Sequence, residues 1–282
     1  MHPLITTRQL AGLLDSPEPP VVVDVRWSLT GSPGRAGYRA GHLPAAVFLD
    51  MDTDLAGPPG PGGRHPLPHP AALQATLRAA GVHTATPVVI YDAADGSVAA
   101  RLWWLLRWAG HPAVAVLDGG IAAWRAAGLP VAINETEPQP GTITVRPGLM
   151  PVLDATQAAA LAGAGVLLDA RVPARYRGDT EPVDPRAGHI PGAVNAPFTE
   201  LTDARERWLT ATRLSELARC WGAGGPQIGV YCGSGINACA LVLGLEVAGV
   251  TSRQRPAALY VGSWSQWCTD PDRPVATGPN PG

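Results

Sequence analysis

The sequence contains no lysine: all 21 basic residues are arginine. This absence excludes a Schiff-base lysine and a Walker-type phosphate loop, because both depend on that amine. Acidic residues number 23, which gives a formal net charge of −2. So small a net charge provides no general field for nucleic acid or an anionic membrane. Any recognition of an anion must therefore be local.

Long apolar runs and cysteines are also scarce. No stretch approaches the roughly 20 apolar residues of a membrane span, and the N-terminus lacks the basic and apolar regions of a signal peptide. We therefore expect a cytoplasmic protein without membrane partners. The four cysteines include no CxxC pair, so we expect reduced thiols, with neither zinc nor a disulfide framework. We also expect no other metal and no cofactor. The cysteines are Cys220, Cys232, Cys239 and Cys268.

What the chain does have is length, apolar content and an internal repeat. Its 282 residues, 46% of them apolar, suit two domains. The sequence AGHLPAAV at 40–47 is echoed by AGHIPGAV at 187–194, and the VVVDVR of 21–26 by the VLLDAR of 166–171. The apolar run ending at Asp92 likewise matches the run ending at Cys232. The chain is therefore predicted to be a tandem duplication in which Asp92 holds the position of Cys232.

Strand and helix patterns alternate in each half, which is typical of an α/β domain with a mainly parallel sheet flanked by helices. We expect domains at 1–134 and 151–282, joined by a proline- and glycine-rich linker at 135–150. Ligands bind at the carboxyl ends of such strands, where Asp92 and Cys232 are placed. Helical spacing predicts that three tryptophans pack in a core instead of binding a ligand: Trp103, Trp104 and Trp108.

Cys232 is the candidate nucleophile. It follows an apolar strand pattern at 227–231 and precedes a helix pattern at 238–248. The N–H groups of the turn and the helix dipole favour a thiolate there. The alternative is a small buried cysteine packed as a hydrophobe. Gly233 and Gly235 argue against that alternative, because they free the loop to turn its N–H groups inward.

Several motifs together resemble the two-domain rhodaneses, most closely the 3-mercaptopyruvate sulfurtransferases. They are CGSGIN at 232–237, GHIPGA at 188–193, YRGDTEP at 176–182 and the aspartate in the first loop. The resemblance implies two tandem rhodanese-like domains, the first non-catalytic. It also implies that sulfur passes from 3-mercaptopyruvate through a Cys232 persulfide to a thiol such as thioredoxin, or to cyanide, with release of pyruvate. Asn237 departs from the common threonine, and 180–186 has extra residues.

The same resemblance carries roles to further residues. Arg175 and Arg186 match carboxylate-binding arginines, for which a planar guanidinium is suited; the alternative is a solvated surface arginine. Ser234, His65 and Asp52 match a serine–histidine–aspartate relay proposed in the family. Without the resemblance, His65 is a surface residue of a glycine-rich loop. The loop residues expected to contact substrate are Gly233, Gly235, Ile236 and Asn237.

Three other readings compete with this one. A thiosulfate sulfurtransferase of this family typically carries arginine and lysine after the cysteine, whereas Gly233 and Ser234 here favour a singly charged keto acid. A cysteine phosphatase needs Cys-x5-Arg, and Ala238 occupies that arginine position. A non-catalytic binding module is disfavoured by Cys232 itself. Cys239 and Cys268 are interpreted as packing residues, with a regulatory disulfide as the alternative.

Overall fold

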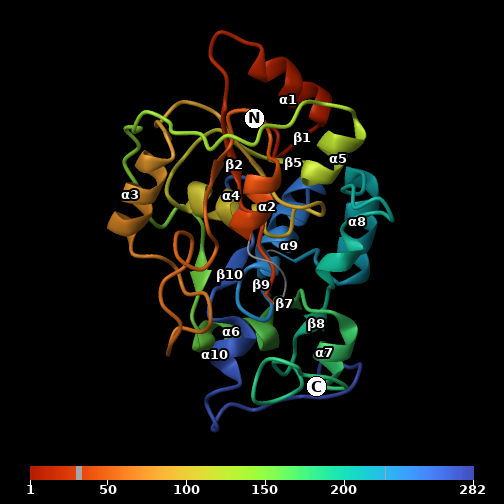
Figure 1. Cartoon of the computed structure of the whole chain (residues 1–282). Coiled ribbons are helices and arrows are strands. Elements are labelled where there is room, and N and C mark those ends of the chain that lie inside the picture. Colours follow the sequence, from red (N-terminus) through yellow and green to blue (C-terminus); the bar gives the residue numbers. More distant parts are fainter. Residues whose placement is uncertain (30–33, 226) are drawn as a thin grey trace. The chain divides into compact units, whose positions relative to one another are not determined.

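A computed structural model describes residues 1–29, 34–225 and 227–282 (Figure 1). The chain divides into two compact units. Unit 1 comprises Met1–Gly57, Pro68–Leu149 and Thr202–Trp208, and unit 2 comprises Pro58–Leu67, Met150–Leu201 and Leu209–Gly282. Each unit is described by itself below.

Unit 1 alternates short strands with helices. In chain order its elements are β1 (Leu4–Ile5), α1 (Thr7–Leu14), β2 (Val21–Asp24), α2 (Gly34–Ala40), β3 (Val47–Phe48), α3 (Pro70–Ala79), β4 (Val88–Tyr91), α4 (Ala99–Trp108), β5 (Val114–Leu117) and α5 (Gly120–Ala126). The described strands form one sheet in the order β1-β5-β4-β2-β3, and every pair is parallel.

Unit 2 repeats this arrangement. Its elements are β6 (Val152–Leu153), α6 (Ala155–Ala164), β7 (Val166–Asp169), α7 (Pro173–Arg177), β8 (Val194–Asn195), the 3-10 turn η1 (Phe198–Glu200), α8 (Ala211–Cys220), β9 (Ile228–Tyr231), α9 (Asn237–Val247), β10 (Ala258–Tyr260) and α10 (Ser263–Trp267). The sheet order is β6-β10-β9-β7-β8, again parallel throughout. The predicted α/β class with mainly parallel sheets is confirmed.

The central strands are buried on both faces because they are continuous apolar runs. All four residues of β4 and of β9 are buried. In unit 1 the core also takes in Trp124 and Tyr38, and in unit 2 it takes in Trp264 and Trp267. Helix α4 is buried along its whole length, so Trp103, Trp104 and Trp108 are packing residues, as predicted.

The two units have the same topology, and several contacts within unit 1 recur at equivalent positions within unit 2. Arg26 pairs with Asp24 and donates to the Gly41 carbonyl, and in unit 2 Arg171 pairs with Asp169 and donates to the Gly188 carbonyl. The ring of Tyr38 stacks on His42 in the same way as that of Tyr176 stacks on His189. These pairs fall at matching positions of the sequence repeat, which accounts for its AGH and DxR motifs.

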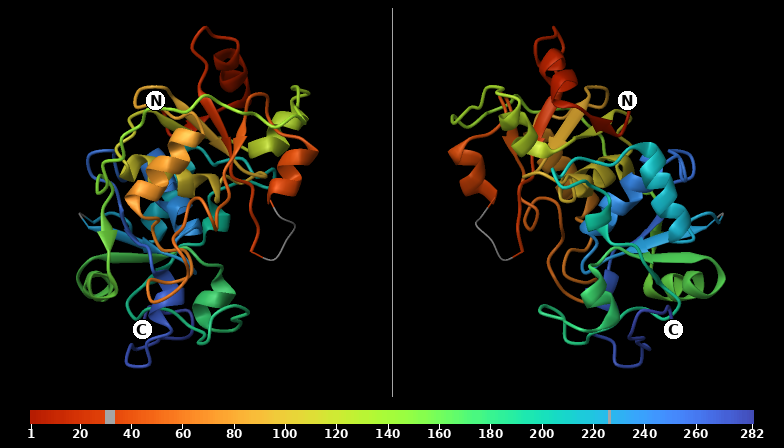
Figure 2. Two further views of the ribbon diagram at one scale, coloured as in Figure 1. Left: turned by 60° about the vertical axis from the view of Figure 1, so that its left-hand side comes forward. Right: turned by 90° about the vertical axis from the view of Figure 1, so that its right-hand side faces the viewer.

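Two segments belong to the unit opposite to the one expected from their place in the sequence. Residues 58–67 come from the first half of the chain and belong to unit 2, whereas 202–208 come from the second half and belong to unit 1. In Figure 2 the first of these, coloured orange, runs among green and blue elements of unit 2. The segment predicted as a linker packs on unit 1, where Arg78 donates through Nε to the Ile143 carbonyl at 2.8 Å.

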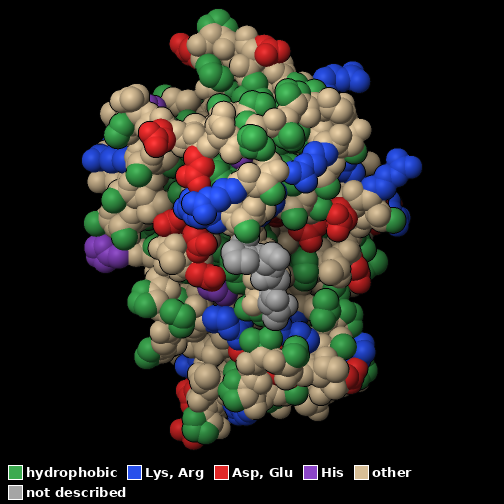
Figure 3. Space-filling model, viewed as in Figure 1, with side chains coloured by type: hydrophobic (Ala, Val, Ile, Leu, Met, Phe, Trp, Pro, Cys, Tyr) green, Lys and Arg blue, Asp and Glu red, His purple; other side chains and the backbone are tan. Residues whose placement is uncertain are grey.

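Acidic and basic side chains are interspersed over the face drawn in Figure 3, in keeping with the small net charge. Among the described residues, no helix is both long and apolar enough to cross a membrane.

Candidate active site

Cys232 follows the last residue of β9 and lies at the carboxyl edge of the sheet, with 4% of its surface exposed. Its main chain is fixed by α10: the Cys232 N–H donates to Ser263 Oγ at 3.2 Å, and its carbonyl accepts from the Trp264 N–H at 2.9 Å. The Gly235 N–H donates to Cys232 Sγ at 3.1 Å. Gly235 has a φ of 81°, a backbone conformation that residues other than glycine adopt only at a cost in free energy.

The remaining loop residues lead into helix α9. Ile236 is buried and occupies the N-cap position, and Asn237 is the first residue of the helix. Because the first N–H groups of a helix have no partner within it, they are available to bind an anion at this end. The loop therefore has the strand–turn–helix form that the sequence predicts.

Asp92 occupies the equivalent place in unit 1, between β4 and α4. Its Oδ1 accepts from the N–H groups of Ala94 and Gly96 at 3.2 and 3.0 Å, and its Oδ2 accepts from those of Val98 and Ala99, both at 3.0 Å. Burial raises the pKa of Asp92 to about 6, Asp95 adds to the shift, and these N–H groups oppose it. The loop of this fold thus presents several N–H groups to one acidic side chain.

The structure brings His65 and Ser234 into contact. The distance between His65 Nδ1 and Ser234 Oγ is 2.8 Å, and both side chains are buried. The segment carrying His65 is anchored by two further bonds: the Arg64 N–H donates to Ser265 Oγ at 3.0 Å, and Gln266 Nε2 donates to the Pro61 carbonyl at 2.8 Å. The glycine-rich loop is therefore an ordered part of unit 2, and His65 is no surface residue.

Asp52, the predicted third member of the relay, belongs to unit 1. Its Oδ2 accepts from Trp27 Nε1 at 2.9 Å, and its N–H donates to Asp50 Oδ1 at 2.9 Å. Its part in the relay stays a prediction.

Arg175 lies against the catalytic loop. A Cβ atom added to Gly233 would stand 3.3 Å from Arg175 Nη1. The other edge of the guanidinium is held by Glu181, with Nε at 3.1 Å from Oε2 and Nη2 at 2.6 Å from Oε1. Nη1 is thus the edge directed at the loop, which fits the predicted contact with a substrate carboxylate.

Arg186 has a different environment from the one predicted. Its Nε donates to the Cys268 carbonyl at 2.8 Å, Nη1 to the Arg273 carbonyl at 3.2 Å and Nη2 to the Asp270 carbonyl at 2.6 Å. These carbonyls follow the end of α10, where a positive charge is favoured. The geometry supports a structural role that joins 186 to the segment after α10, in place of a substrate contact.

The site also contains charged residues that the sequence reasoning did not select. Asp184 forms ion pairs with Arg64 and Arg175. Glu181 forms one with Arg175, and its Oε2 lies 3.5 Å from Arg171 Nη1. Burial raises the pKa of Asp184, although Arg64 and Arg175 oppose the shift. The signal available in the sequence was the high density of acidic and basic residues through 175–186, together with an arginine directly before His65.

The remaining cysteines differ in burial, and one of them, Cys239, supports the catalytic loop. Cys239, on α9, donates through Sγ to the Gly235 carbonyl at 3.2 Å, and Cys268 is buried after α10. Both are packing residues in this structure, whereas Cys220 is exposed.

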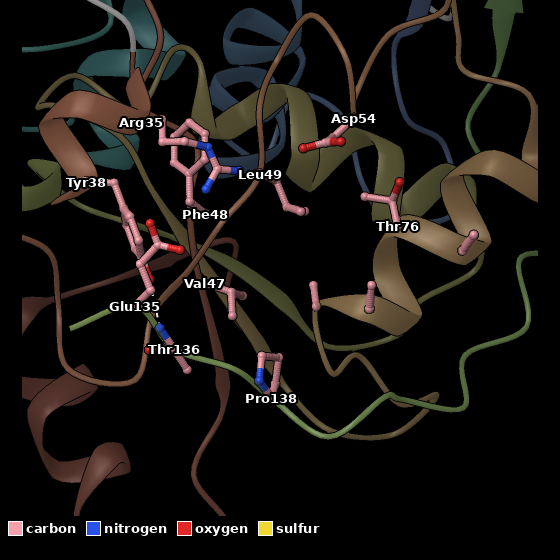
Figure 4. A pocket seen from close by; sticks show the side chains of 13 residues that line it. Arg35, Tyr38, Val47, Phe48, Leu49, Asp54, Thr76, Glu135, Thr136 and Pro138 are labelled. Atoms are coloured by element: carbon pink, nitrogen blue, oxygen red, sulfur yellow. Dashed lines mark hydrogen bonds between the residues drawn. The ribbon is translucent and has the colours of Figure 1, made fainter.

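A cavity of about 480 Å³ lies within unit 1 (Figure 4). Its polar lining mixes Arg35, Asp54, Thr76 and Glu135 with the ring of Phe48. Arg35 is already placed over that ring, 4.9 Å from its centroid. This cavity contains none of the residues of the candidate active site, and its mixed charges select no one class of ligand.

The parallel α/β fold occurs twice, and a cysteine loop lies at the carboxyl edge of only one of the two described sheets; these features define a class of two-domain proteins. The model of the rhodanese-like domain matches this chain twice, at residues 6–127 and 154–270. The chain therefore belongs to the rhodanese family, and its two tandem rhodanese-like domains confirm the predicted resemblance.

Its relatives are named as sulfurtransferases of two kinds. A putative thiosulfate sulfurtransferase SseB of Mycobacterium tuberculosis is 45% identical over 280 residues, covering 98% of this chain and 97% of that protein. A probable 3-mercaptopyruvate sulfurtransferase of Pseudomonas aeruginosa is 44% identical, with 98% of each chain covered. The crystal structure of the 3-mercaptopyruvate enzyme SseA from Escherichia coli superposes with a TM-score of 0.82 at 29% identity, covering 94% of this chain and all of that chain.

Proposed function

We propose that the chain is a sulfurtransferase that takes sulfur from 3-mercaptopyruvate onto Cys232 and passes it to a thiol or to cyanide. The observation that carries the proposal is the placement of Cys232 Sγ, which accepts the N–H of Gly235 in the turn before α9. The counterpart loop of unit 1 directs four N–H groups at a carboxylate. A persulfide extends one atom beyond Sγ, much as carboxylate oxygens extend beyond their carbon, so similar N–H groups can stabilise its charge.

In the first half-reaction the Cys232 thiolate attacks the sulfur of 3-mercaptopyruvate. A sulfur–sulfur bond forms, the carbon–sulfur bond breaks, and its electron pair remains with the departing enolate of pyruvate. Protonation of the enolate carbon yields pyruvate. In the second half-reaction an acceptor thiolate or cyanide attacks the outer sulfur and regenerates the Cys232 thiolate.

The surrounding residues have distinct tasks in this reaction. Arg175 Nη1 lies beside Gly233 and is placed to bind the single carboxylate of the keto acid. Ser234, 2.8 Å from His65, is placed to assist as charge develops on the enolate oxygen. We include Asp52 in the proposal as the third member of the serine–histidine–aspartate relay. This role is supported by motif matching alone.

Thiosulfate is the second candidate donor, because the M. tuberculosis relative carries that name. It shares the persulfide step but forms no enolate. The presence of glycine and serine, instead of basic residues, at 233 and 234 favours the keto acid. Thioredoxin or another thiol as the acceptor, and a cytoplasmic location, remain predictions from the sequence.

The test is the intact mass of the protein after incubation with 3-mercaptopyruvate and removal of small molecules. We expect a gain of one sulfur atom, lost again on addition of cyanide. Cys232→Ser should show no gain, and Cys220→Ser, which alters the exposed cysteine, should behave as the unaltered protein. If no sulfur is added after incubation with 3-mercaptopyruvate, and none after a second incubation with thiosulfate, the proposal is refuted.

A further inference from the structure

Asp184 joins Arg175, whose guanidinium contacts the catalytic loop, with Arg64, whose main chain is linked to that loop by Ser265. Its Oδ2 lies 3.0 Å from Arg175 Nη2, and its Oδ1 pairs closely with Arg64 Nη2. Arg175 contacts the loop at Gly233. Arg64 reaches it through Ser265, whose Oγ accepts the Arg64 N–H and whose N–H donates to the Gly233 carbonyl.

The Asp184 side chain is only 4% exposed, whereas those of Arg175 and Arg64 are 18% and 21% exposed. A buried carboxylate is poorly screened by solvent, so its charge acts strongly on its neighbours. It binds the Nη2 atoms of both arginines and so offsets their positive charge.

The ionic residues around the loop form one chain of alternating sign. Asp169 pairs with Arg171, Arg171 with Glu181, Glu181 with Arg175, Arg175 with Asp184 and Asp184 with Arg64. Three arginines are thus matched by three carboxylates, and the cluster has no net charge. Without Asp184 it would carry one positive charge beside the loop.

We infer that Asp184 sets the donor preference, by keeping this cluster neutral and so disfavouring dianionic sulfur donors relative to monoanionic ones. The inference rests on the proposed sulfurtransferase function and concerns its substrate class. A donor with two negative charges gains twice the Coulomb energy from one added positive charge that a donor with one charge gains. Asp184 is a positioning residue in this scheme, since it acts through Arg64 and Arg175.

The test is Asp184→Asn, which keeps the size of the side chain and removes its charge. Thiosulfate is the dianionic probe and 3-mercaptopyruvate the monoanionic one. We expect the ratio of kcat/KM for thiosulfate to that for 3-mercaptopyruvate to rise about threefold to tenfold, through a lower KM for thiosulfate. The thiosulfate reaction of the variant should also slow more steeply with added salt.

Three further variants separate charge from structure. Asp179→Asn removes a carboxylate from the same segment, but Asp179 is half exposed and pairs with Arg177 outside the cluster, so the ratio should not change. Asp184→Glu keeps the charge and should keep the preference. Arg64→Gln removes a positive charge and should shift the ratio in the opposite direction, which keeps the inference testable if Asp184→Asn does not fold.

An unchanged ratio in folded Asp184→Asn, or equal losses with both donors, would overturn the inference. A change in the ratio for Asp179→Asn as large as that for Asp184→Asn would also overturn it. Failure of the proposed function is a separate result, since it is read from the unaltered protein as absence of sulfur on Cys232. If that protein accepts sulfur from thiosulfate alone, the keto acid is the wrong donor, but Asp184→Asn must still lower the KM for thiosulfate.

Discussion

The N–H group of Gly235 donates a hydrogen bond to Sγ of Cys232 at 3.1 Å, and Gly235 has a φ of 81°. We expect Gly235→Ala to slow persulfide formation about tenfold to hundredfold, because a displaced N–H no longer meets the sulfur. Left-handed backbone costs an alanine about 1–2 kcal/mol as well. The measurement is the rate of sulfur loading on Cys232 from 3-mercaptopyruvate.

Gly249 provides the matched control for this variant. It follows the end of α9 with a φ of 71° and open space around its Cα. Gly249→Ala should therefore lose a similar amount of stability in denaturant unfolding without slowing sulfur loading. Equal rates for the two variants would show that the Gly235 effect is one of stability alone.

The two arginines of the predicted carboxylate site should respond differently to substitution. Arg175→Ala should raise KM for 3-mercaptopyruvate about tenfold to hundredfold, because it removes a charge-assisted contact. Arg186→Ala should instead lower the free energy of unfolding by about 1–3 kcal/mol, since several carbonyls after α10 lose their donor. Its folded fraction should keep the normal KM. A raised KM in Arg186→Ala with unchanged stability would restore it as a substrate ligand.

Ser234 and His65, whose polar atoms lie 2.8 Å apart, should act as one unit on one donor. Ser234→Ala and His65→Ala should slow turnover with 3-mercaptopyruvate by about 10²–10⁴-fold, and far less with thiosulfate, which forms no enolate. The double variant should cost little beyond either single one. Steady-state kinetics with both donors tests this. Equal losses with the two donors would mean a distorted loop instead of a relay.

Asp92 should matter for stability and not for chemistry. Its carboxylate accepts four N–H groups, so Asp92→Ala leaves buried donors without their acceptor and should cost at least about 2 kcal/mol in denaturant unfolding. The turnover of the folded variant should be nearly unchanged. Asp95→Ala is the control, since Asp95 accepts from the Ser97 N–H and should cost less. A loss of kcat comparable to that of Cys232→Ser would contradict this role.

Cys268 should react with alkylating reagents only at high pH. Burial raises the pKa of its thiol, and Asp184 adds to the shift, so at a given pH a smaller fraction is thiolate, the reactive form. Its labelling by iodoacetamide should be at least about tenfold slower than that of exposed Cys220 near pH 8 and should rise at higher pH. Peptide mass spectrometry measures both sites. Equal labelling near pH 8 would make a redox role for Cys268 plausible again.

Local pattern was enough for the fold class and for the position of the proposed nucleophile. Apolar runs such as those of β4 and β9 specify buried parallel strands by themselves, and the strand–glycine–helix sequence around Cys232 specifies the loop at their end. The repeat of AGH and DxR motifs records contacts inside each unit, such as Arg171 with Asp169, only two residues apart. Information of this kind lies within one or two neighbouring elements, so the sequence determined it.

Tertiary structure decided which polar and charged residues meet. His65 and Ser234 are 169 residues apart in the chain, and Arg64 and Asp184 are 120 apart; no periodicity links such positions. Arg175 and Arg186 look alike as motif residues, yet one faces Gly233 and the other binds carbonyls after α10. An arginine can donate to a carboxylate or to a carbonyl, so its role depends on which partner the fold brings within reach.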